Sequence, residues 1–143
     1  GLGGLGMITL THYAGKWRTW PDWTMDVEQN ALRLLTSVNA LEAEMAAGGI
    51  RFPDNPATRN GISGTLYGGF RPQACPIGAP ASAHKRGQAV DRYDPHGLID
   101  GWCMAHQDRL AWHGIWLEHP DATPGWSHWA CVPPKSGNRV FVP

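Results

Sequence analysis

The segment SAHKRGQAVD, residues 82–91, constrains this chain more than any other, because it places an imidazole and a carboxylate seven positions apart across a glycine. Histidine nitrogen and carboxylate oxygen are ordinary zinc ligands, and a catalytic zinc takes three protein ligands and keeps one position open for water. Gly87 can turn the chain between the two groups, since glycine readily adopts a positive φ. The following residues predict a short strand whose alternation puts Asp91 on the opposite face from Val90. The plainer interpretation is a turn followed by a strand, with His84 a surface residue.

This segment resembles the zinc-binding signature of the D-Ala-D-Ala metallopeptidase family, which includes D,D-dipeptidases, D,D-carboxypeptidases and phage L-alanyl-D-glutamate endolysins. The same fold occurs in the hedgehog signalling domain and in lysostaphin-type enzymes. The family carries a third ligand, a histidine on a late strand preceded by a tryptophan or another bulky residue, and GWSHWA supplies it here as His128. The resemblance covers the chain from about Met25 onward. It implies one zinc ion held by His84, Asp91 and His128.

The catalytic base does not follow the usual spacing. Members of the family commonly carry an acid three positions before the last histidine ligand, but Gly125 stands there in this chain. Alternation along GIWLE puts Glu118 on the opposite face from Leu117, so that one face enters the core and the other points into a cleft. Asp121 lies in HPDATPG, whose proline and glycine indicate a loop, where acids are usually only solvated. We therefore favour Glu118 as the base and keep Asp121 as the alternative.

Three further residues are candidates for contact with the substrate. GGFRP predicts the end of a strand, and the family often carries an arginine in a similar context just upstream of the first ligand. The resemblance implies that Arg71 binds the substrate carboxylate or polarises the scissile carbonyl, which suits a planar guanidinium that stays charged; a surface ion pair is the alternative. Ser82 is expected to bond either to the substrate or to the loop backbone. Trp126 shares a strand face with His128, and is expected to stack on the substrate or to wall off the zinc.

The function that the resemblance implies is zinc-dependent hydrolysis of a peptide bond in the stem peptide of bacterial peptidoglycan. Zinc would polarise the carbonyl and lower the pKa of its water. Glu118 would carry the proton from that water to the leaving amine, while Arg71 and zinc stabilise the oxyanion. Cleavage of the L-alanyl-D-glutamate bond and removal of the terminal D-alanine are both open. We lean to the endopeptidase, because a lysin must cut a bond that holds the mesh together.

Two other functions are compatible with the pattern. Zinc could serve stability alone in a non-catalytic wall-binding module or phage structural module, as the hedgehog relatives suggest, and the displaced acid favours this alternative. A cytoplasmic D,D-dipeptidase that acts on free D-Ala-D-Ala would need a small, closed pocket. The presence of a catalytic base separates the binding module from the two enzymes.

Composition fits one globular domain. The chain has 143 residues, of which 42% are hydrophobic and 17% charged, as is typical of a single domain. We expect residues 7–143 to form this zinc peptidase domain and residues 1–6 to be a remnant of protein expression. The formal net charge of +0 gives no reason to expect nucleic acid as a partner. No apolar run has the length of a membrane span, and we expect a monomer.

Cysteine usage and the amino-terminal sequence bear on the compartment. Cys75, Cys103 and Cys131 are odd in number and lack C-x-x-C spacing, so neither a disulfide framework nor a thiolate zinc site is indicated. Free thiols fit synthesis in a reducing cytoplasm. The start, GLGGLGMITL, lacks the cationic region and long apolar stretch of a signal peptide. With the resemblance, this favours a small phage or prophage endolysin, made in the cytoplasm and acting at the bacterial cell wall.

The pattern of residues predicts an α+β domain with a small, mostly antiparallel sheet, two main helices and a zinc cleft across one sheet face. The first helix is capped by Thr24, carries an apolar face at helical spacing and ends at Gly48. The second is expected to begin with Asp94 as cap and Pro95 at its first position, and to stop near Gly114. Strands are expected near GTLYGGFR, QAVDRY, GIWLE, WSHWACV and RVFV.

The remaining aromatic and imidazole side chains are given structural roles. Trp17, Trp20 and Trp23 stand at a spacing of three in an irregular aromatic segment, residues 11–23. They either pack the amino terminus onto the core, the commoner use of such residues, or present a platform for glycans. Five histidines fit no zinc spacing and are treated as non-ligands, namely His12, His96, His106, His113 and His119.

Overall fold

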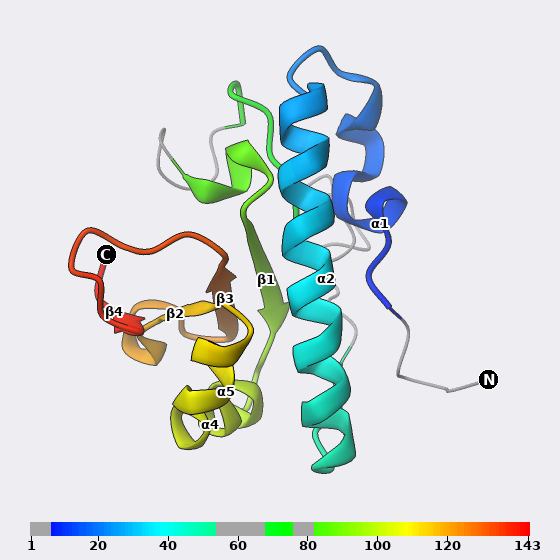
Figure 1. Cartoon of the computed structure of the whole chain (residues 1–143). Coiled ribbons are helices and arrows are strands. Elements are labelled where there is room, and N and C mark those ends of the chain that lie inside the picture. The colour runs from blue at the N-terminus through cyan, green and yellow to red at the C-terminus, as the bar shows by residue number, and fades with distance from the viewer. Residues whose placement is uncertain (1–6, 54–67, 76–81) are drawn as a thin grey trace.

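The structure is a computed structural model that describes residues 7–53, 68–75 and 82–143. In these residues the long helix α2, Met25–Ala47, lies along one face of a four-stranded sheet (Figure 1). The architecture is α+β, as the sequence pattern predicted. No described helix is both long enough and apolar enough to cross a membrane.

Helix α2 begins and ends where the sequence predicted. The hydroxyl of Thr24 accepts a hydrogen bond from the N–H of Val27 at 3.2 Å, which satisfies one of the otherwise unpaired donors of the first turn. Gly48 is the C-cap, and Gly49 follows with a φ of +92°, which a glycine adopts without strain. The helix buries one apolar stripe, made up of Ala31, Leu34, Leu35, Val38, Leu41 and Met45.

The segment before α2 is more regular than we predicted. Residues Leu10–Ala14 form the short helix α1, capped by the hydroxyl of Thr9, and Gly15–Thr19 continue it as the 3₁₀ helix η1. The expectation of an irregular segment was therefore wrong, because a local cap compensates for the lack of helical periodicity.

The aromatic residues of this segment differ in how far they pack into the core. The ring of Trp23 packs edge-on against Phe70, with 5.1 Å between ring centroids, and also contacts Tyr13. Trp17 packs against the core from its edge. Trp20 touches Trp17 edge-on and is 43% exposed. Core packing thus explains Trp17 and Trp23, whereas Trp20 packs on Trp17 and keeps part of its ring exposed.

The sheet has the strand order β1-β3-β2-β4. Its strands are β1 (Ala89–Tyr93), β2 (Trp116–Glu118), β3 (Trp126–Ala130) and β4 (Val140–Phe141). Strand β3 pairs antiparallel with both β1 and β2, while β4 joins β2 in parallel. The sheet is therefore mixed; we expected a mostly antiparallel sheet, and two of the three pairings are antiparallel while that of β4 is parallel.

The expected strand GTLYGGFR lies partly outside the described residues, and its described part is not a strand. Gly68 has a φ of +54°, a conformation that interrupts an extended run. The segment still runs beside the sheet, because the N–H of Asp91 bonds to the carbonyl of Gly68 at 3.0 Å. Phe70 in turn donates its N–H to the carbonyl of Tyr13 at 3.0 Å.

The second helix begins later than predicted and is divided in two. It consists of α4 (Leu98–Ala105) and α5 (Gln107–Trp112). Gly97, rather than Asp94, is the N-cap, although the carboxylate of Asp94 does accept the N–H groups of Ile99 and Asp100 at 3.0 and 2.9 Å. The N–H of Gly97 bonds to the carbonyl of Asp94 and closes a turn, so that Pro95 lies in this turn rather than in the helix.

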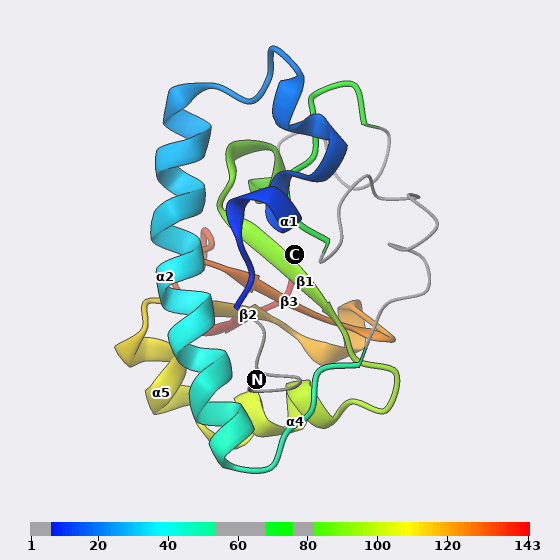
Figure 2. The same ribbon diagram turned by 90° about the vertical axis from the view of Figure 1, so that its right-hand side faces the viewer.

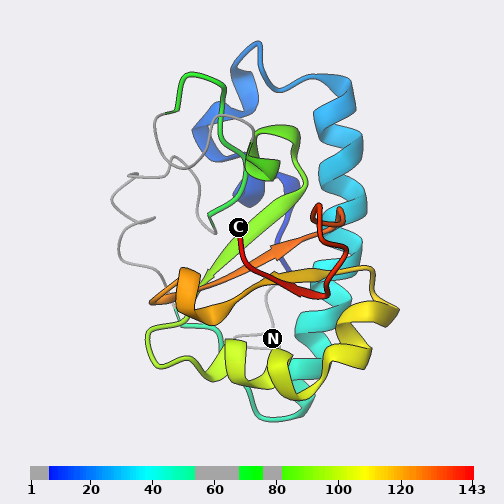
Figure 3. The same cartoon turned by 90° about the vertical axis from the view of Figure 1, so that its left-hand side faces the viewer.

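The helices and the sheet form two layers. Figure 2, seen from the side of α1 and α2, shows both helices in front of the sheet, and Figure 3 shows the opposite sheet face. Short helices α4 and α5 contact β3 and β2 at one end of the sheet. The core lies between α2 and the inward strand residues Val90, Leu117 and Trp129, which are fully buried. We call the other side of the sheet, which no described helix covers, the open face.

Candidate metal centre

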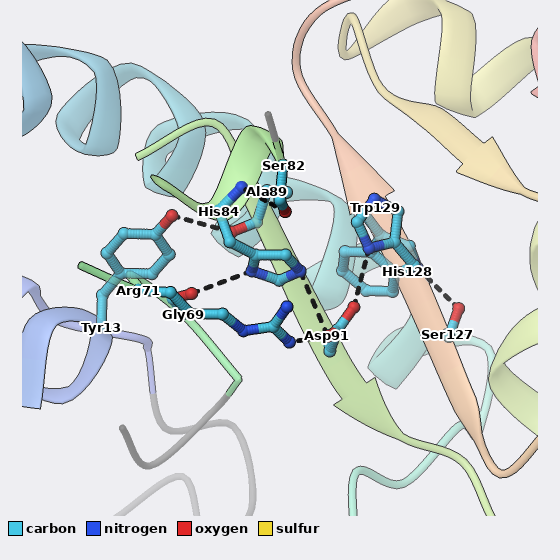
Figure 4. Close-up of polar contacts among 10 residues, drawn as sticks. All are labelled: Tyr13, Gly69, Arg71, Ser82, His84, Ala89, Asp91, Ser127, His128 and Trp129. Atoms are coloured by element: carbon cyan, nitrogen blue, oxygen red, sulfur yellow. Dashed lines mark hydrogen bonds and ion pairs between the residues drawn. The ribbon is translucent and has the colours of Figure 1, made fainter. Parts of the chain in front are cut away.

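The three ligands predicted from the sequence converge on the open face. Register pairs Asp91 of β1 with His128 of β3, and His84 lies just before β1 on the 3₁₀ helix η2, Ala83–Arg86. Asp91 Oδ2 is 3.2 Å from His84 Nε2, and Asp91 Oδ1 is 2.8 Å from His128 Nδ1 (Figure 4). One ligand atom from each residue lies within 4.8 Å of the other two. No other cluster of three such residues occurs in the described part of the chain.

The donor set and its spacing fit a zinc ion. Two imidazole nitrogens and one carboxylate oxygen are common zinc ligands, and tetrahedral ligands at about 2.1 Å from the metal lie about 3.4 Å apart. The observed separations, 3.2 and 2.8 Å to the two oxygens of Asp91, are somewhat shorter than that edge, and the three ligand atoms lie within 4.8 Å of one another. Three protein ligands leave a fourth position, which is the arrangement of catalytic rather than structural zinc sites.

The backbone around Gly69 fixes the orientation of His84. The Nδ1 atom of His84 is 2.9 Å from the carbonyl oxygen of Gly69, which can only accept, so the Nδ1–H group donates this hydrogen bond. The Nε2 lone pair therefore faces Asp91, and such an outer contact is the usual way to orient a histidine ligand. A side chain at Gly69 would lie 2.3 Å from the carbonyl oxygen of Tyr13, and one at Gly68 would lie 2.8 Å from Asp91 Cβ. Both glycines are required by close packing.

Sequence reasoning missed this supporting layer. The hydroxyl of Tyr13 donates a hydrogen bond to the carbonyl of Ala89 at 2.7 Å, in the interior, and so ties α1 to the start of β1. The only signal in the sequence is the pair Gly68–Gly69, which stands just before the aromatic residue and the arginine of GGFRP. The carbonyl of Gly69 carries no sequence signature, because any residue type has one.

Arg71 and Ser82 both lie beside the triad. The Nη2 atom of Arg71 is 3.0 Å from Asp91 Oδ2, and the side chain is nearly buried. This arginine thus forms an ion pair, although with a buried candidate ligand rather than at the surface. The hydroxyl of Ser82 accepts the N–H of His84 at 3.3 Å and caps η2. The structural role that we considered for Ser82 is the one observed.

Burial and the neighbouring charges shift the pKa values of the three candidate ligands in different directions. Burial lowers the pKa of His84, and this outweighs the charge of Asp91. Burial alone would raise the pKa of Asp91, but the charges and hydrogen bonds of His84 and His128 hold this pKa well below its usual range. For His128, burial lowers the pKa, but the hydrogen bond and the charge of Asp91 reverse this effect and the net pKa is raised.

The two candidate bases differ in position. Glu118 is half-buried at the end of β2. Its pKa is raised by burial and by the charge of Asp91, which together outweigh the charge of His128. The side chain of Asp121, in contrast, is 95% exposed to solvent. Gly125, where the family commonly has its acid, has a φ of +85°. Glu118 is thus the acid that lies within electrostatic reach of the triad.

Three of the histidines that we treated as non-ligands make structural contacts. The ring of His106 stacks on Trp102 with 4.1 Å between centroids, and His113 contacts Glu44. His119 accepts the N–H of Asp121 at 3.1 Å and caps the 3₁₀ helix η3, Pro120–Ala122. The cysteines Cys75, Cys103 and Cys131 form no disulfide.

Aromatic side chains also lie on the open face. Trp126 is half-buried and packs against Tyr93, with 5.7 Å between ring centroids. Phe141 of β4 lies edge-on to His128 at 6.4 Å. Trp126 lies two residues before His128 on β3, and so on the same strand face as that candidate ligand.

The fold and the site together define an α+β protein with a candidate His-Asp-His metal centre on the open face of a mixed sheet. No protein-family model, curated protein or solved structure matches this chain. The function has to be argued from the geometry of the centre and from the motif residues themselves.

Proposed function

We propose that this protein is a zinc-dependent peptidase that hydrolyses a peptide bond in the stem peptide of bacterial peptidoglycan. The observation that carries the proposal is the convergence of His84, Asp91 and His128 to within 4.8 Å, on residues that the signature S-x-H-x-x-G-x-A-x-D and the later histidine single out. The resemblance to the D-Ala-D-Ala metallopeptidase family supplies the substrate class and the hedgehog-like fold, and both belong to the proposal.

The chain's own residues suit such a reaction. Bound zinc supplies a Lewis acid for the scissile carbonyl and makes its water more acidic. Glu118 then accepts a proton from the attacking water and returns it to the leaving amine; its raised pKa suits this exchange, because a base with a pKa closer to neutrality can also act as the acid. Arg71 holds Asp91 in place through a 3.0 Å ion pair. Its positive charge also favours the oxyanion that develops on the carbonyl.

The biological setting is part of the same proposal. A small phage or prophage endolysin, made in the cytoplasm and acting at the cell wall, fits a peptidase of this type. We favour cleavage of the L-alanyl-D-glutamate bond and keep removal of the terminal D-alanine as the alternative. Trp126 would then contact the bound peptide, since it shares the strand face of His128.

A second candidate is a non-catalytic, zinc-stabilised module that binds the cell wall or forms part of a phage structure. The observation that favours it is the glycine at position 125. In addition, Glu118 makes no hydrogen bond to the three candidate ligands within the described residues. In such a module zinc would add stability, as structural zinc sites do.

Mass spectrometry of purified peptidoglycan separates the two candidates. We expect the zinc-loaded protein to release new amino termini or free D-alanine, and a chelator-treated sample to release neither. The mass of the products identifies the bond. If protein shown to hold one zinc per chain leaves several peptidoglycan types uncut, the peptidase proposal is wrong and the non-catalytic module is favoured.

A further inference from the structure

Near the candidate metal centre, the open face carries an arginine, Arg139, whose guanidinium is held in a fixed position. Arg139 lies just before β4, and its guanidinium stacks over the ring of Trp116 at 4.4 Å. Its Nη1 donates to the carbonyl of Ile115 at 3.0 Å, and its own carbonyl accepts the N–H of Leu117 at 2.9 Å. Both the side chain and the backbone of Arg139 are thus tied to β2.

The strand register places this cation on the same face as the triad. Glu118 pairs with Phe141, and Leu117 with Val140, so the neighbouring residues Trp116 and Arg139 share the face of Glu118. Phe141 contacts the ring of His128 from that face, whereas Leu117 is fully buried on the other.

Arg139 is half-buried and is held by its contacts with β2, yet it makes no ion pair with an acid among the described residues. Four arginines pair with acids, in the couples Arg18–Glu28, Arg71–Asp91, Arg92–Glu42 and Arg109–Glu44. No acid in the described part of the chain comes within ion-pair distance of Arg139. A half-buried guanidinium that is already oriented loses little side-chain freedom when an anion binds.

We propose that Arg139 and Trp116 form a subsite for a carboxylate of the peptide substrate, separate from the metal centre; this rests on the proposed peptidase function. Trp116 pairs with Ala130, two residues along β3 from His128. With strands about 4.8 Å apart and a rise of about 3.4 Å per residue, Trp116 lies about 8 Å from His128. That distance equals about two residues of extended peptide. The recognised carboxylate is therefore on a residue next to the scissile bond or one further along.

The subsite assigns binding of the substrate carboxylate to Arg139 instead of Arg71. We considered Arg71 for the substrate carboxylate, but its Nη2 is already 3.0 Å from Asp91 Oδ2. Binding a second carboxylate there would place two like charges side by side, which is unfavourable in a buried setting. Arg139 has no such competitor, and a guanidinium and an aromatic ring together suit an acidic residue with an apolar stem.

Binding of two peptides tests the subsite independently of turnover. The probes are synthetic stem tetrapeptides that differ only in the acidic residue beside the scissile bond, which carries a carboxylate in one and a carboxamide in the other. Calorimetric titration into zinc-loaded Glu118→Gln protein measures affinity without cleavage. We expect the carboxylate peptide to bind roughly tenfold more tightly, as for a charge-assisted hydrogen bond. The variant Arg139→Gln should remove this preference, and Arg139→Lys should retain part of it.

The control is Arg33→Gln, which removes the same charge from an exposed residue of α2 and should leave the preference intact. Equal affinities of the two peptides for the parent protein, or a preference that survives Arg139→Gln in folded protein, would overturn the subsite. Cleavage by the wild-type protein is measured in parallel. If the protein prefers the carboxylate peptide through Arg139 but cleaves no peptidoglycan, the subsite is supported and the peptidase is rejected. If it cleaves peptidoglycan but shows no such preference, the peptidase is supported and the subsite is rejected.

Discussion

Two carboxylates of this molecule each gather imidazole and guanidinium groups, with different outcomes. Asp91 contacts His84, His128 and Arg71 at 3.2, 2.8 and 3.0 Å. Glu44 of α2 contacts both Arg109, at 2.6 and 3.0 Å, and His113. The first cluster is a candidate metal centre, whereas the second is a set of ion pairs between two helices.

The difference lies in the number of imidazoles and in the support of each carboxylate. Asp91 is on a strand and 16% of its side chain is exposed, while 32% of the Glu44 side chain is exposed. A single imidazole and a forked guanidinium satisfy Glu44 by hydrogen bonds. Two imidazoles facing one carboxylate provide three lone pairs that can converge on a cation. The same residue types thus form a candidate metal centre only where strand register pairs Asp91 with His128 and the 3₁₀ helix η2 adds the second imidazole, His84.

The sharpest test of this comparison removes one imidazole from each cluster. His128→Ala leaves two ligands, and we expect zinc affinity to fall by more than the roughly 10- to 100-fold that outer contacts of metal sites are worth. Peptidoglycan cleavage should disappear with the metal. His113→Ala should bind one zinc per chain as the wild type does. Elemental analysis and titration against a chromophoric chelator measure both, and equal zinc content in the two variants would contradict the assignment.

The next largest effect should come from the acid near the centre. Glu118→Gln keeps the size of the side chain and removes the proton acceptor, so kcat should fall roughly 10²- to 10⁴-fold, the usual contribution of a general base. Zinc content should be unchanged. The matched control is Asp121→Asn, whose side chain is in solvent and whose kcat we expect to stay near that of the wild type. If the control loses activity instead, the base is Asp121.

A third acid tests whether burial alone can shift a carboxyl group. Glu42 lies on α2 near Glu44, but faces β1, where Arg92 is 2.9 Å away. It is 8% exposed, and burial raises its pKa to about 7, against the opposing charge of Arg92. An acid with a raised folded-state pKa contributes stability below its unfolded pKa of 4.5, and this is lost as the pH rises to about 7.

Glu42→Gln should remove that dependence. The free energy of unfolding of the wild type, relative to the variant, should decrease by roughly 3 kcal/mol between pH 4.5 and pH 8, at 1.36 kcal/mol per pKa unit. Denaturant titrations at several pH values measure the difference, in which the contributions of other groups cancel. A difference that stays constant with pH would mean that Arg92 keeps Glu42 ionised throughout.

These sites also show how far the sequence leads. Strand alternation placed Asp91 and His128 on one face of the sheet, and Glu118 opposite a buried Leu117, because a period of two is a local property. The apolar stripe and the cap of α2 are equally local, and both were predicted. The composition of the motif, rather than its geometry, indicated zinc.

What the sequence did not reveal depends on contacts between distant residues. The bond from Tyr13 to Ala89 spans 76 positions, and the bond from His84 to the carbonyl of Gly69 uses a group that every residue has. The later start of α4 follows from a backbone turn that closes on Asp94. The parallel pairing of β4, which brings Arg139 over Trp116, has no periodic signal in two residues.

The smallest expected effect is at the cluster of Glu44, Arg109 and His113. The pKa of Glu44 is lowered, so its contribution to stability changes with pH in the opposite direction to that of Glu42. The pKa of Glu44 is lowered to about 2, mainly by the hydrogen bonds from Arg109. Slight burial opposes this shift, and His113 adds to it. Its stabilisation is therefore present above the unfolded pKa of 4.5 and is lost as the pH falls toward 2. Because water and salt screen such a pair, we expect Glu44→Gln to cost about 1 kcal/mol or less at neutral pH. Thermal unfolding at low and high salt measures this loss of stability. A larger loss that does not depend on salt would mean that the cluster behaves as a buried ion pair. The difference between Glu44 and Asp91 would then lie in the second imidazole alone.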